Sequence, residues 1–244
     1  MGSSYDRIGI GYREIRRPDP RLESLIADAL DGARSVVNVG AGAGSYEPAT
    51  ARVVAVEPSA VMLAQHPGLT RVQASAESLP FPAGTFDAAM AIMTIHHWTD
   101  FRAGLAEMRR VAHRQLLFTW DKDHDEELWI VSEYVPEIRD LEHARFPSLR
   151  EITDALGGGE VVAFPIPHDF VDGYQPAFWR RPQAYLDARV RAASSTFATL
   201  PDRVVEPAMR RLEADLASGA WARRHGDLLD RATVDYGYRL IVRG

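Results

Sequence analysis

A short apolar run that breaks into alternating glycines limits the fold of this chain more than any other feature. Residues 35–39 read SVVNV, and GAGAG follows at once over residues 40–44. A β-branched run of this length predicts a buried parallel strand. Glycines at alternate positions let the following turn pass close to a ligand. Together they predict a strand and turn of the kind that bind nucleoside ligands in open α/β sheets.

Segments with strand and helix patterns alternate along the chain. Apolar runs predict strands at 35–39, 52–57, 69–74, 85–93, 115–120 and 160–164, and helical periodicity predicts helices at 21–30, 60–65, 101–111, 128–134 and 148–156. This alternation is typical of an α/β fold with a mostly parallel sheet and helices on both faces. A final run at 236–242 predicts a seventh strand, antiparallel beside the strand at 160–164.

The stretch before this last strand leaves the α/β rhythm. It is helical in pattern, rich in aromatic side chains, and interrupted by Pro176, Pro182, Pro201 and Pro207. We expect residues 172–232 to form a helical cap that is inserted before the last strand and carries the substrate region. Residues 1–171 would form the cofactor-binding core, and residues 233–244 would complete it with the last strand.

Composition excludes several classes of function. With 28 basic against 34 acidic residues, the net charge is −6, which gives no general attraction to nucleic acid. Cysteine is absent, so disulfide and thiol chemistry are excluded. No apolar stretch approaches the roughly 18 residues that cross a bilayer, and the first residues lack the apolar core of a signal peptide. We therefore expect a cytoplasmic protein that contacts neither membrane nor nucleic acid.

An acidic residue ends the second predicted strand. A carboxylate at Glu57 can accept hydrogen bonds from the two hydroxyls of a ribose, so the glycine turn and Glu57 predict a nucleoside-binding site. The glycine spacing is GxGxG, whereas the dinucleotide fingerprint is GxGxxG. This difference disfavours a nicotinamide oxidoreductase.

Four segments carry a resemblance to a known family. VVNVGAGAGSYEP, VVAVEPSAVML, ASAESLPFPAGTFDAAMAIMTIHHW and AEMRRVAHRQLLFTWD together resemble class I S-adenosylmethionine-dependent methyltransferases of the ubiquinone/menaquinone-biosynthesis type. The resemblance covers residues 1–170 and the final strand. It implies a Rossmann-like, seven-stranded sheet, S-adenosylmethionine as cofactor, and methyl transfer to a small molecule.

The resemblance also assigns cofactor-binding residues. In the family, the glycine turn passes under the methionine part, the acid after the second strand holds the ribose, and an Ala-Glu pair borders the adenine. These roles fall on Gly40, Gly42, Gly44, Glu57, Ala76 and Glu77. Adjoining positions complete the expected site: Tyr12, Arg16, Asn38, Ala41, Pro58, Met62, Ser75, Met93 and Thr94. Asn38 and Ser75 depart from the family, which usually has acidic residues at those positions.

Histidines are the candidates for acid–base chemistry. Methyl transfer is an in-line displacement, and an acceptor that carries a proton benefits from a positioned base. His96 follows the fourth strand and is the first candidate, and His168, beside Asp169, is the second. An acceptor pocket, neutral or aromatic in preference, is expected from His97, Tyr174, Phe178 and Trp179. Packing in the protein interior is the alternative role for each of these residues.

Two further alternatives remain open. The acidic cluster at residues 121–127 could bind a divalent cation, but acids before a helix explain it equally well, and we expect no metal. The fold itself can also serve non-methylating chemistry or regulatory cofactor binding. No motif identifies the acceptor, the atom that is methylated or the oligomeric state.

Overall fold

A seven-stranded sheet forms the centre of the computed structural model, which describes residues 15–244. The strands lie in the order β3-β2-β1-β4-β5-β9-β6, and β9 is antiparallel to both of its neighbours. The bounds are β1 (Ser35–Val39), β2 (Arg52–Val56), β3 (Arg71–Val72), β4 (Phe86–Ile92), β5 (Ala112–Trp120), β6 (Glu160–Ala163) and β9 (Tyr238–Arg243). The predicted mostly parallel sheet, with the last strand antiparallel beside β6, is confirmed.

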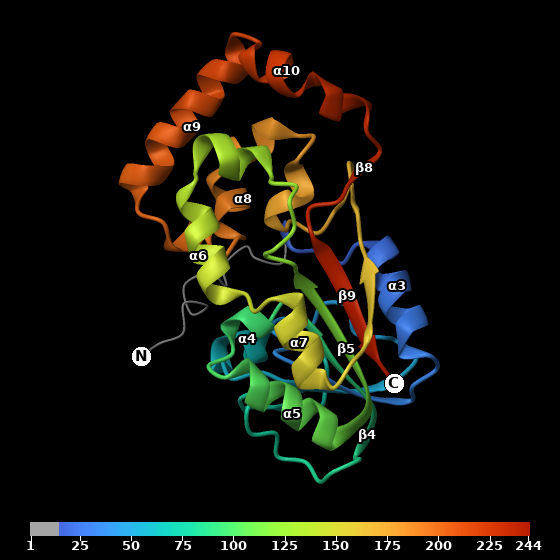
Figure 1. Ribbon diagram of the computed structural model, residues 1–244. Helices are drawn as coiled ribbons and strands as arrows, with labels where there is room; N and C mark the ends of the chain where they lie inside the picture. Colours follow the sequence, from blue (N-terminus) through green and yellow to red (C-terminus); the bar gives the residue numbers. More distant parts are fainter. Residues whose placement is uncertain (1–14) are drawn as a thin grey trace.

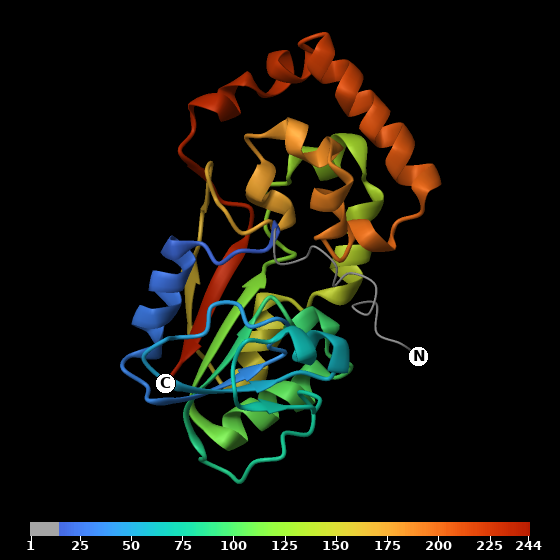
Figure 2. The ribbon, with the colours of Figure 1, turned by 180° about the vertical axis from the view of Figure 1, so that it is seen from behind.

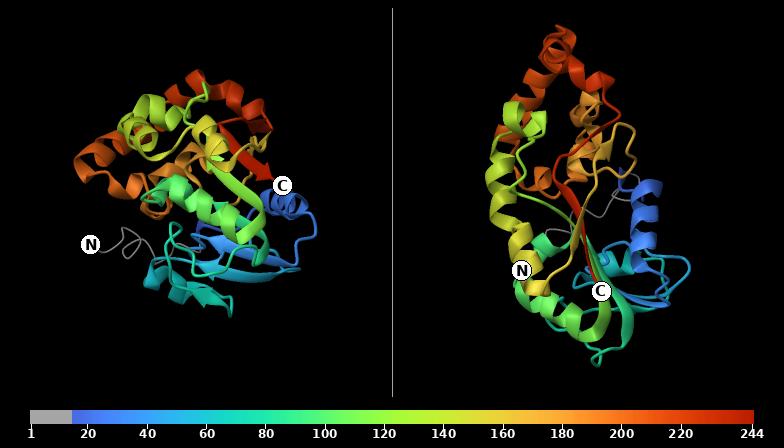
Figure 3. Two further views of the ribbon diagram at one scale, coloured as in Figure 1. Left: turned by 60° about the horizontal axis from the view of Figure 1, so that its bottom comes forward. Right: turned by 45° about the vertical axis from the view of Figure 1, so that its right-hand side comes forward.

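Helices cover both faces of this sheet (Figure 3). Helix α3 (Pro20–Leu30) packs on one face, and α5 (Phe101–Val111) and α7 (Leu149–Leu156) pack on the other. Neighbouring residues in a strand belong to opposite cores, as Val36 and Val37 do in β1. A strand with a core on each side is apolar on both faces along most of its length, and this explains the β-branched runs of the sequence.

Most predicted element boundaries hold to within one or two residues, because capping side chains fix the helix ends. Asp19 and Asp100 cap α3 and α5, and Ser148 with Glu151 forms a capping box on α7. Helix α4 (Ala60–Gln65) begins after the cap residue Ser59. The third strand is shorter than predicted, since this edge strand pairs only with Ala55 and Val56.

An upper layer of helices lies beyond the carboxyl ends of the parallel strands (Figures 1 and 2). Residues 175–230 supply η3 (Gln175–Phe178), η4 (Pro182–Leu186), α8 (Ala188–Ala192), η5 (Phe197–Thr199), α9 (Asp202–Ala217), α10 (Ala220–His225) and η6 (Gly226–Asp230). The same layer includes η2 (Ile130–Tyr134), a π-helical turn, and α6 (Glu137–Arg145). Helix α6 was not predicted, because Ile138 is its only fully buried residue and its apolar pattern is weak.

Tryptophans hold the two segments of the upper layer together. The indole nitrogen of Trp129 donates a 2.8 Å hydrogen bond to the carbonyl oxygen of Trp179, and its ring meets those of Tyr185 and Trp221 edge to face. Tyr134 donates a 2.7 Å hydrogen bond to Asp215 on α9. The upper layer is therefore built from residues 128–146 as well as from the stretch predicted as the cap.

A two-stranded ribbon, which the sequence did not predict, connects the upper layer to the sheet. It pairs β7 (Ile166–Pro167) with β8 (Thr233–Val234) in antiparallel orientation. Each strand is too short to show a periodic pattern. No helix in the described residues combines the length and apolar composition needed to cross a bilayer.

Candidate functional site

A cavity of about 480 Å³ lies where the strand ends meet the upper layer. Its floor consists of residues that directly follow strands, among them Gly40 after β1, Glu57 after β2 and Met93 after β4. Residues from α6 and from the segment 193–196 close the opposite side. This is the position at which open α/β sheets bind ligands.

The glycine turn forms part of the floor, and its backbone geometry explains the glycines. Gly40 has a φ of +73°, and a Cβ there would lie 2.0 Å from Oγ1 of Thr94. Gly42 also has a positive φ, of +53°. The turn is held against β2, because the N–H groups of Gly40 and Ala41 both donate to the carbonyl oxygen of Val56. A side chain at Gly40 or Gly42 would occupy the space that the turn leaves beside the cavity floor.

Gly44, which the resemblance assigned to the cofactor, is not among the residues that line the cavity. A Cβ at Gly44 would lie 2.8 Å from Nε2 of His66 and 3.0 Å from Pro67. Its φ of +84° and this close approach explain the glycine without a ligand. The third glycine of the motif therefore serves packing behind the turn.

Glu57 lies on the cavity floor with both carboxylate oxygens engaged by backbone. Oε2 accepts a 3.0 Å hydrogen bond from the N–H of Gly42, and Oε1 accepts one of 2.9 Å from Ser59. Burial raises the pKa of Glu57 above its usual range, although these two hydrogen bonds oppose the rise. Each oxygen has a further lone pair, so the carboxylate can still accept from ribose hydroxyls. The residues present thus fit a nucleoside cofactor.

A carboxylate that the sequence analysis missed stands behind Asn38. Nδ2 of Asn38 donates a 2.9 Å hydrogen bond to Oε1 of Glu47, and Nε2 of His66 lies 2.8 Å from the same oxygen. Asn38 occupies the position where the family usually has an acid. Glu47, nine residues further along the chain, places a carboxylate beside Asn38, where the family has the acid itself. Its distance from the motif is why the pattern did not indicate it.

Most of the predicted cofactor residues line this one cavity. They are Arg16, Asn38, Gly40, Ala41, Gly42, Glu57, Pro58, Met62, Ser75, Ala76, Glu77, Met93 and Thr94. Tyr12 lies outside the described residues. Arg16 is anchored by an ion pair of 2.5 Å to Asp172 and lies over the ring of Tyr174, 4.2 Å from its centroid.

His96 and His97 line the cavity beside an aromatic wall. The ring of His96 is stacked on Phe146, with centroids 4.1 Å apart, and is tilted against His97. Burial, reinforced by the positive charge of Arg145, lowers the pKa of His97 to about 4. Burial also lowers the pKa of His96 well below its ordinary value. Both rings are therefore neutral at neutral pH.

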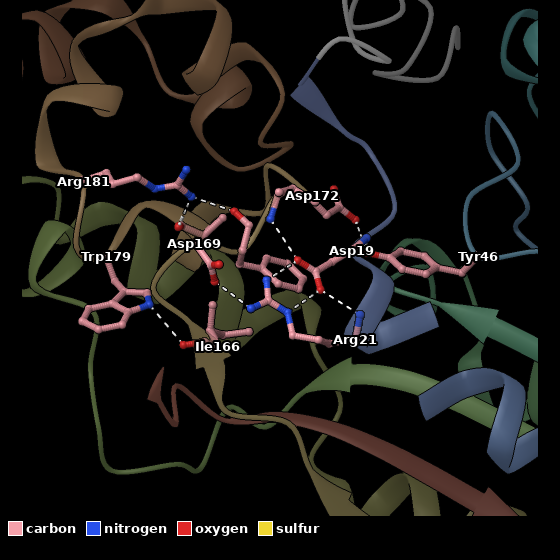
Figure 4. A network of polar contacts seen from close by, with 11 residues as sticks. Asp19, Arg21, Tyr46, Ile166, Asp169, Asp172, Trp179 and Arg181 are labelled. Atoms are coloured by element: carbon pink, nitrogen blue, oxygen red, sulfur yellow. Dashed lines mark hydrogen bonds and ion pairs between the residues drawn. The ribbon is translucent and has the colours of Figure 1, made fainter. Parts of the chain in front are cut away.

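Three residues predicted near the acceptor, His168, Phe178 and Trp179, make their contacts elsewhere. The backbone N–H of His168 bonds to Ala232 beside the β7–β8 ribbon, and Asp169 pairs with Arg21 instead of orienting that histidine. Trp179 is fully buried and donates to the carbonyl oxygen of Ile166 (Figure 4). Phe178 packs edge to face on Tyr185. Neither cavity described here is lined by these residues, whereas Tyr174 does line the first one.

A second cavity, of about 470 Å³, adjoins the first. The two share four lining residues: Trp120, Glu142, Gln175 and Tyr238. Residues 122–127 of the acidic cluster line the second cavity, where Glu127 is paired with Arg139. Within residues 15–244, no cluster of three or more His, Cys, Asp or Glu side chains is arranged to hold a metal ion.

Glu142 supplies the carboxyl group at the junction of these cavities, and the sequence analysis did not single it out. Its Oε1 accepts a 3.1 Å hydrogen bond from Oγ1 of Thr196. Burial raises the pKa of Glu142 to about 7, although that hydrogen bond and the charge of Arg145 act against the rise. The sequence did not indicate this role, because the helix that carries Glu142, α6, was not predicted.

Comparisons with known proteins agree with this geometry. Residues 37–116 match the model of a methyltransferase domain family. A solved structure described as a candidate methyltransferase from an antibiotic biosynthesis pathway of Anabaena variabilis ATCC 29413 is 33% identical, with a TM-score of 0.88 over 94% of this chain and 99% of that one.

Two curated relatives match part of the chain. An uncharacterized methyltransferase of Bacillus subtilis (strain 168), YcgJ, is 31% identical over 132 residues, or 48% of this chain and 52% of that protein. A chloroplastic 2-methyl-6-phytyl-1,4-hydroquinone methyltransferase of Oryza sativa subsp. japonica is 29% identical over 44% of this chain and 36% of its own length. The matched segments thus span about half or less of these curated relatives.

The glycine turn, the acid after β2 and the cavity at the strand ends agree with the full-length structural match. The predicted enzyme class and cofactor are confirmed on these grounds. The chain belongs to the class I S-adenosylmethionine-dependent methyltransferases.

Proposed function

We propose that this chain transfers the methyl group of S-adenosylmethionine to a small neutral acceptor with a flat, largely apolar body. The observation that carries the proposal is the set of aromatic rings around the cavity opposite the glycine turn. Trp120, Phe146, Tyr174 and Tyr238 all line it. Flat apolar walls with few charges favour aromatic or polyene-like surfaces over phosphorylated ones.

Size and enclosure support a small acceptor. The two adjoining cavities have volumes of about 480 and 470 Å³, and the upper layer covers the strand ends. Pockets of several hundred Å³ hold small molecules, whereas a polymer needs an open groove. The net charge of −6 further opposes a polyanionic acceptor.

The rice relative supports an aromatic acceptor. Its name assigns it a substituted hydroquinone as substrate. We extend this class to the present chain as part of the proposal.

The residues of the site can do the work that methyl transfer requires. S-adenosylmethionine supplies an activated methyl group on a positively charged sulfur. Glu57 and the glycine turn are proposed to hold the nucleoside and methionine parts, and His96 and His97 to form the wall beside the acceptor. The upper layer covers the strand ends, and alignment of the reacting atoms would supply most of the rate.

We also propose that cofactor binding and acceptor selection belong to different segments of the chain. Residues 1–171 and 233–244 would bind the cofactor, and residues 172–232 would select the acceptor. Gln175 and the segment 193–196 support this, since they line the first cavity from the upper layer. Glu142 and Phe146 extend the acceptor region to α6 and the residue that follows it.

Incubation with methyl-labelled S-adenosylmethionine and a metabolite extract tests the proposal. Mass spectrometry should find one or a few small aromatic compounds that gain the labelled methyl group. The matched control is the Glu57→Ala variant at the same concentration, which should give far less product. An enzyme that binds the cofactor but labels nothing would instead support the non-methylating alternative.

A further inference from the structure

We propose that Glu142 is the catalytic base, which removes a proton from the acceptor as the methyl group is transferred. The inference rests on the proposed function and deepens it, because it assigns the acceptor to the classes that carry a removable proton. Such acceptors bear an O–H, an N–H or an acidic C–H group. A thioether or another acceptor without a proton would need no such base.

The position of Glu142 supports this role. It lies near the end of α6 and lines both cavities, so its side chain borders the route from the cofactor side to the second cavity. The hydrogen bond from Thr196 fixes one carboxylate oxygen. Because Thr196 precedes η5, two separate segments of the upper layer fix the base above the strand ends.

The surroundings of Glu142 favour proton transfer at neutral pH. Burial raises its pKa to about 7, close to the value at which a base is both ionised and basic. The two histidines on the same wall differ from it in this respect. Burial lowers the pKa of His96 and of His97, so each remains neutral but holds an added proton weakly. A carboxylate is thus better matched to the task than either ring.

Charged groups around Glu142 come from several different elements. Arg145 on the same helix is the charge that acts on Glu142 directly. Arg16 reaches the first cavity, where Asp172 already neutralises it. Tyr238 on β9 faces the same space, and burial raises its pKa far above its ordinary value, so it stays protonated.

On the other side, the second cavity is lined by further charged and titratable groups: Lys122, Asp123, His124, Asp125, Glu126, Glu127, Arg139 and His143. The first and second cavities therefore place mixed charges near Glu142. No single neighbour sets its ionisation, and burial remains the dominant cause.

The proposed step balances as a displacement with proton transfer. A lone pair, or the electron pair of the acceptor's X–H bond, forms the new bond to the methyl carbon. The carbon–sulfur bond breaks, and its electron pair stays on sulfur, which becomes neutral. The proton of the X–H group passes to the carboxylate of Glu142. At neutral pH this carboxyl then releases the proton to solvent by way of the second cavity, which Glu142 also lines.

A spectroscopic titration tests Glu142 without any acceptor. Difference infrared spectra from pH 5 to pH 9 should show a buried carboxylic acid that deprotonates with a midpoint near 7. This band should be absent from Glu142→Gln and present in Glu137→Gln, an exposed glutamate on the same helix that lines neither cavity. An infrared titration near pH 7 that Glu142→Gln leaves unchanged would overturn the proposal.

A kinetic experiment tests the catalytic role. The probe is the initial rate of label transfer from methyl-labelled S-adenosylmethionine into the small-molecule fraction of a metabolite extract. In the unmodified enzyme this rate should rise with an apparent pKa near 7. Glu142→Gln should lower it by about 10²–10⁴-fold and remove the pH dependence. Affinity for S-adenosylhomocysteine should stay within a few-fold, which shows that the variant is folded.

The outcomes separate this inference from the proposed function. If the unmodified enzyme transfers label to no compound, the proposed function fails and the base fails with it. If it transfers label and Glu142→Gln keeps the rate and the pH profile, only the base is overturned. Loss of the pH profile in His96→Ala but not in Glu142→Gln would assign the base to His96 instead.

Discussion

The hydroxyl of Tyr46 donates a 2.8 Å hydrogen bond to Oδ2 of Asp172 and thereby joins the glycine turn to the loop that leads into the upper layer. The same hydroxyl accepts a 3.2 Å hydrogen bond from the N–H of Asp19 (Figure 4). Asp172 also holds Arg16 at the cavity. One buried tyrosine therefore connects the cofactor turn, the amino-terminal segment and the upper layer.

Removal of this hydroxyl should destabilise the protein. Tyr46→Phe leaves the buried carboxylate of Asp172 with one partner fewer, so the free energy of unfolding should fall by about 1–3 kcal/mol. Denaturation by urea measures the loss. The matched control is Tyr134→Phe, whose partner Asp215 is partly exposed, so that water can replace the bond and the loss should be smaller. Equal losses in both variants would contradict the role given to Tyr46.

The clash at Gly40 gives a second prediction. Gly40 and Gly32 have the same φ of +73°, but a Cβ at Gly32 meets nothing within 4 Å, whereas at Gly40 it meets Thr94. Gly32→Ala should cost roughly 1–2 kcal/mol for the left-handed backbone alone. Gly40→Ala should cost about 1–3 kcal/mol more and should weaken cofactor binding. Urea denaturation and calorimetry measure the two effects, and similar behaviour of the two variants would show that the turn has room for a side chain.

The sheet and its turn could be predicted from sequence because their signals are local. Val36 and Val37 are buried on opposite faces, so the strand needs apolar side chains on both sides, and the glycines follow from φ values and close contacts. Glu57 could be predicted because it directly follows a strand. Glu47 could not, because its role arises from a contact with Asn38 that depends on the path of the turn.

The stability of the protein should depend on the protonation of Glu142. Its pKa is about 7 in the folded protein against an ordinary 4.5, so between these values the folded state holds a proton that the unfolded chain has lost. Stability relative to Glu142→Gln should therefore fall as the pH rises from 4.5 to 7, on the order of 3 kcal/mol in all, and stay level above. Urea denaturation at several pH values measures this difference. A difference that does not change with pH would contradict the raised pKa.

Because Trp179 is buried in the interior, its removal should affect stability and not acceptor binding. Trp179 is fully buried, and its carbonyl oxygen accepts the hydrogen bond from Trp129. Trp179→Ala should therefore lower the free energy of unfolding by about 3–5 kcal/mol through the cavity that it leaves. Urea denaturation tests this. Unchanged stability with a raised KM for the acceptor would return Trp179 to the acceptor pocket.

The upper layer was the part that the sequence predicted least well. Tyr174 and Trp179 both belong to one aromatic-rich stretch, yet Tyr174 faces the cavity and Trp179 faces the interior. Helical periodicity cannot separate these roles in short 3₁₀ turns broken by prolines, because no regular face exists. Helix α6, with Glu142, was missed because most of its residues are polar and only its tertiary contacts give them a role.

Titration calorimetry with S-adenosylmethionine, with its demethylated product and with NAD tests the cofactor assignment on which the whole account depends. We expect one molecule of either S-adenosyl compound to bind per chain and NAD to bind far more weakly. Glu57→Ala should weaken binding of the S-adenosyl compounds by about 1–3 kcal/mol, since Glu57 accepts hydrogen bonds at the cavity floor. Tight binding of NAD with no binding of S-adenosylmethionine would contradict the account.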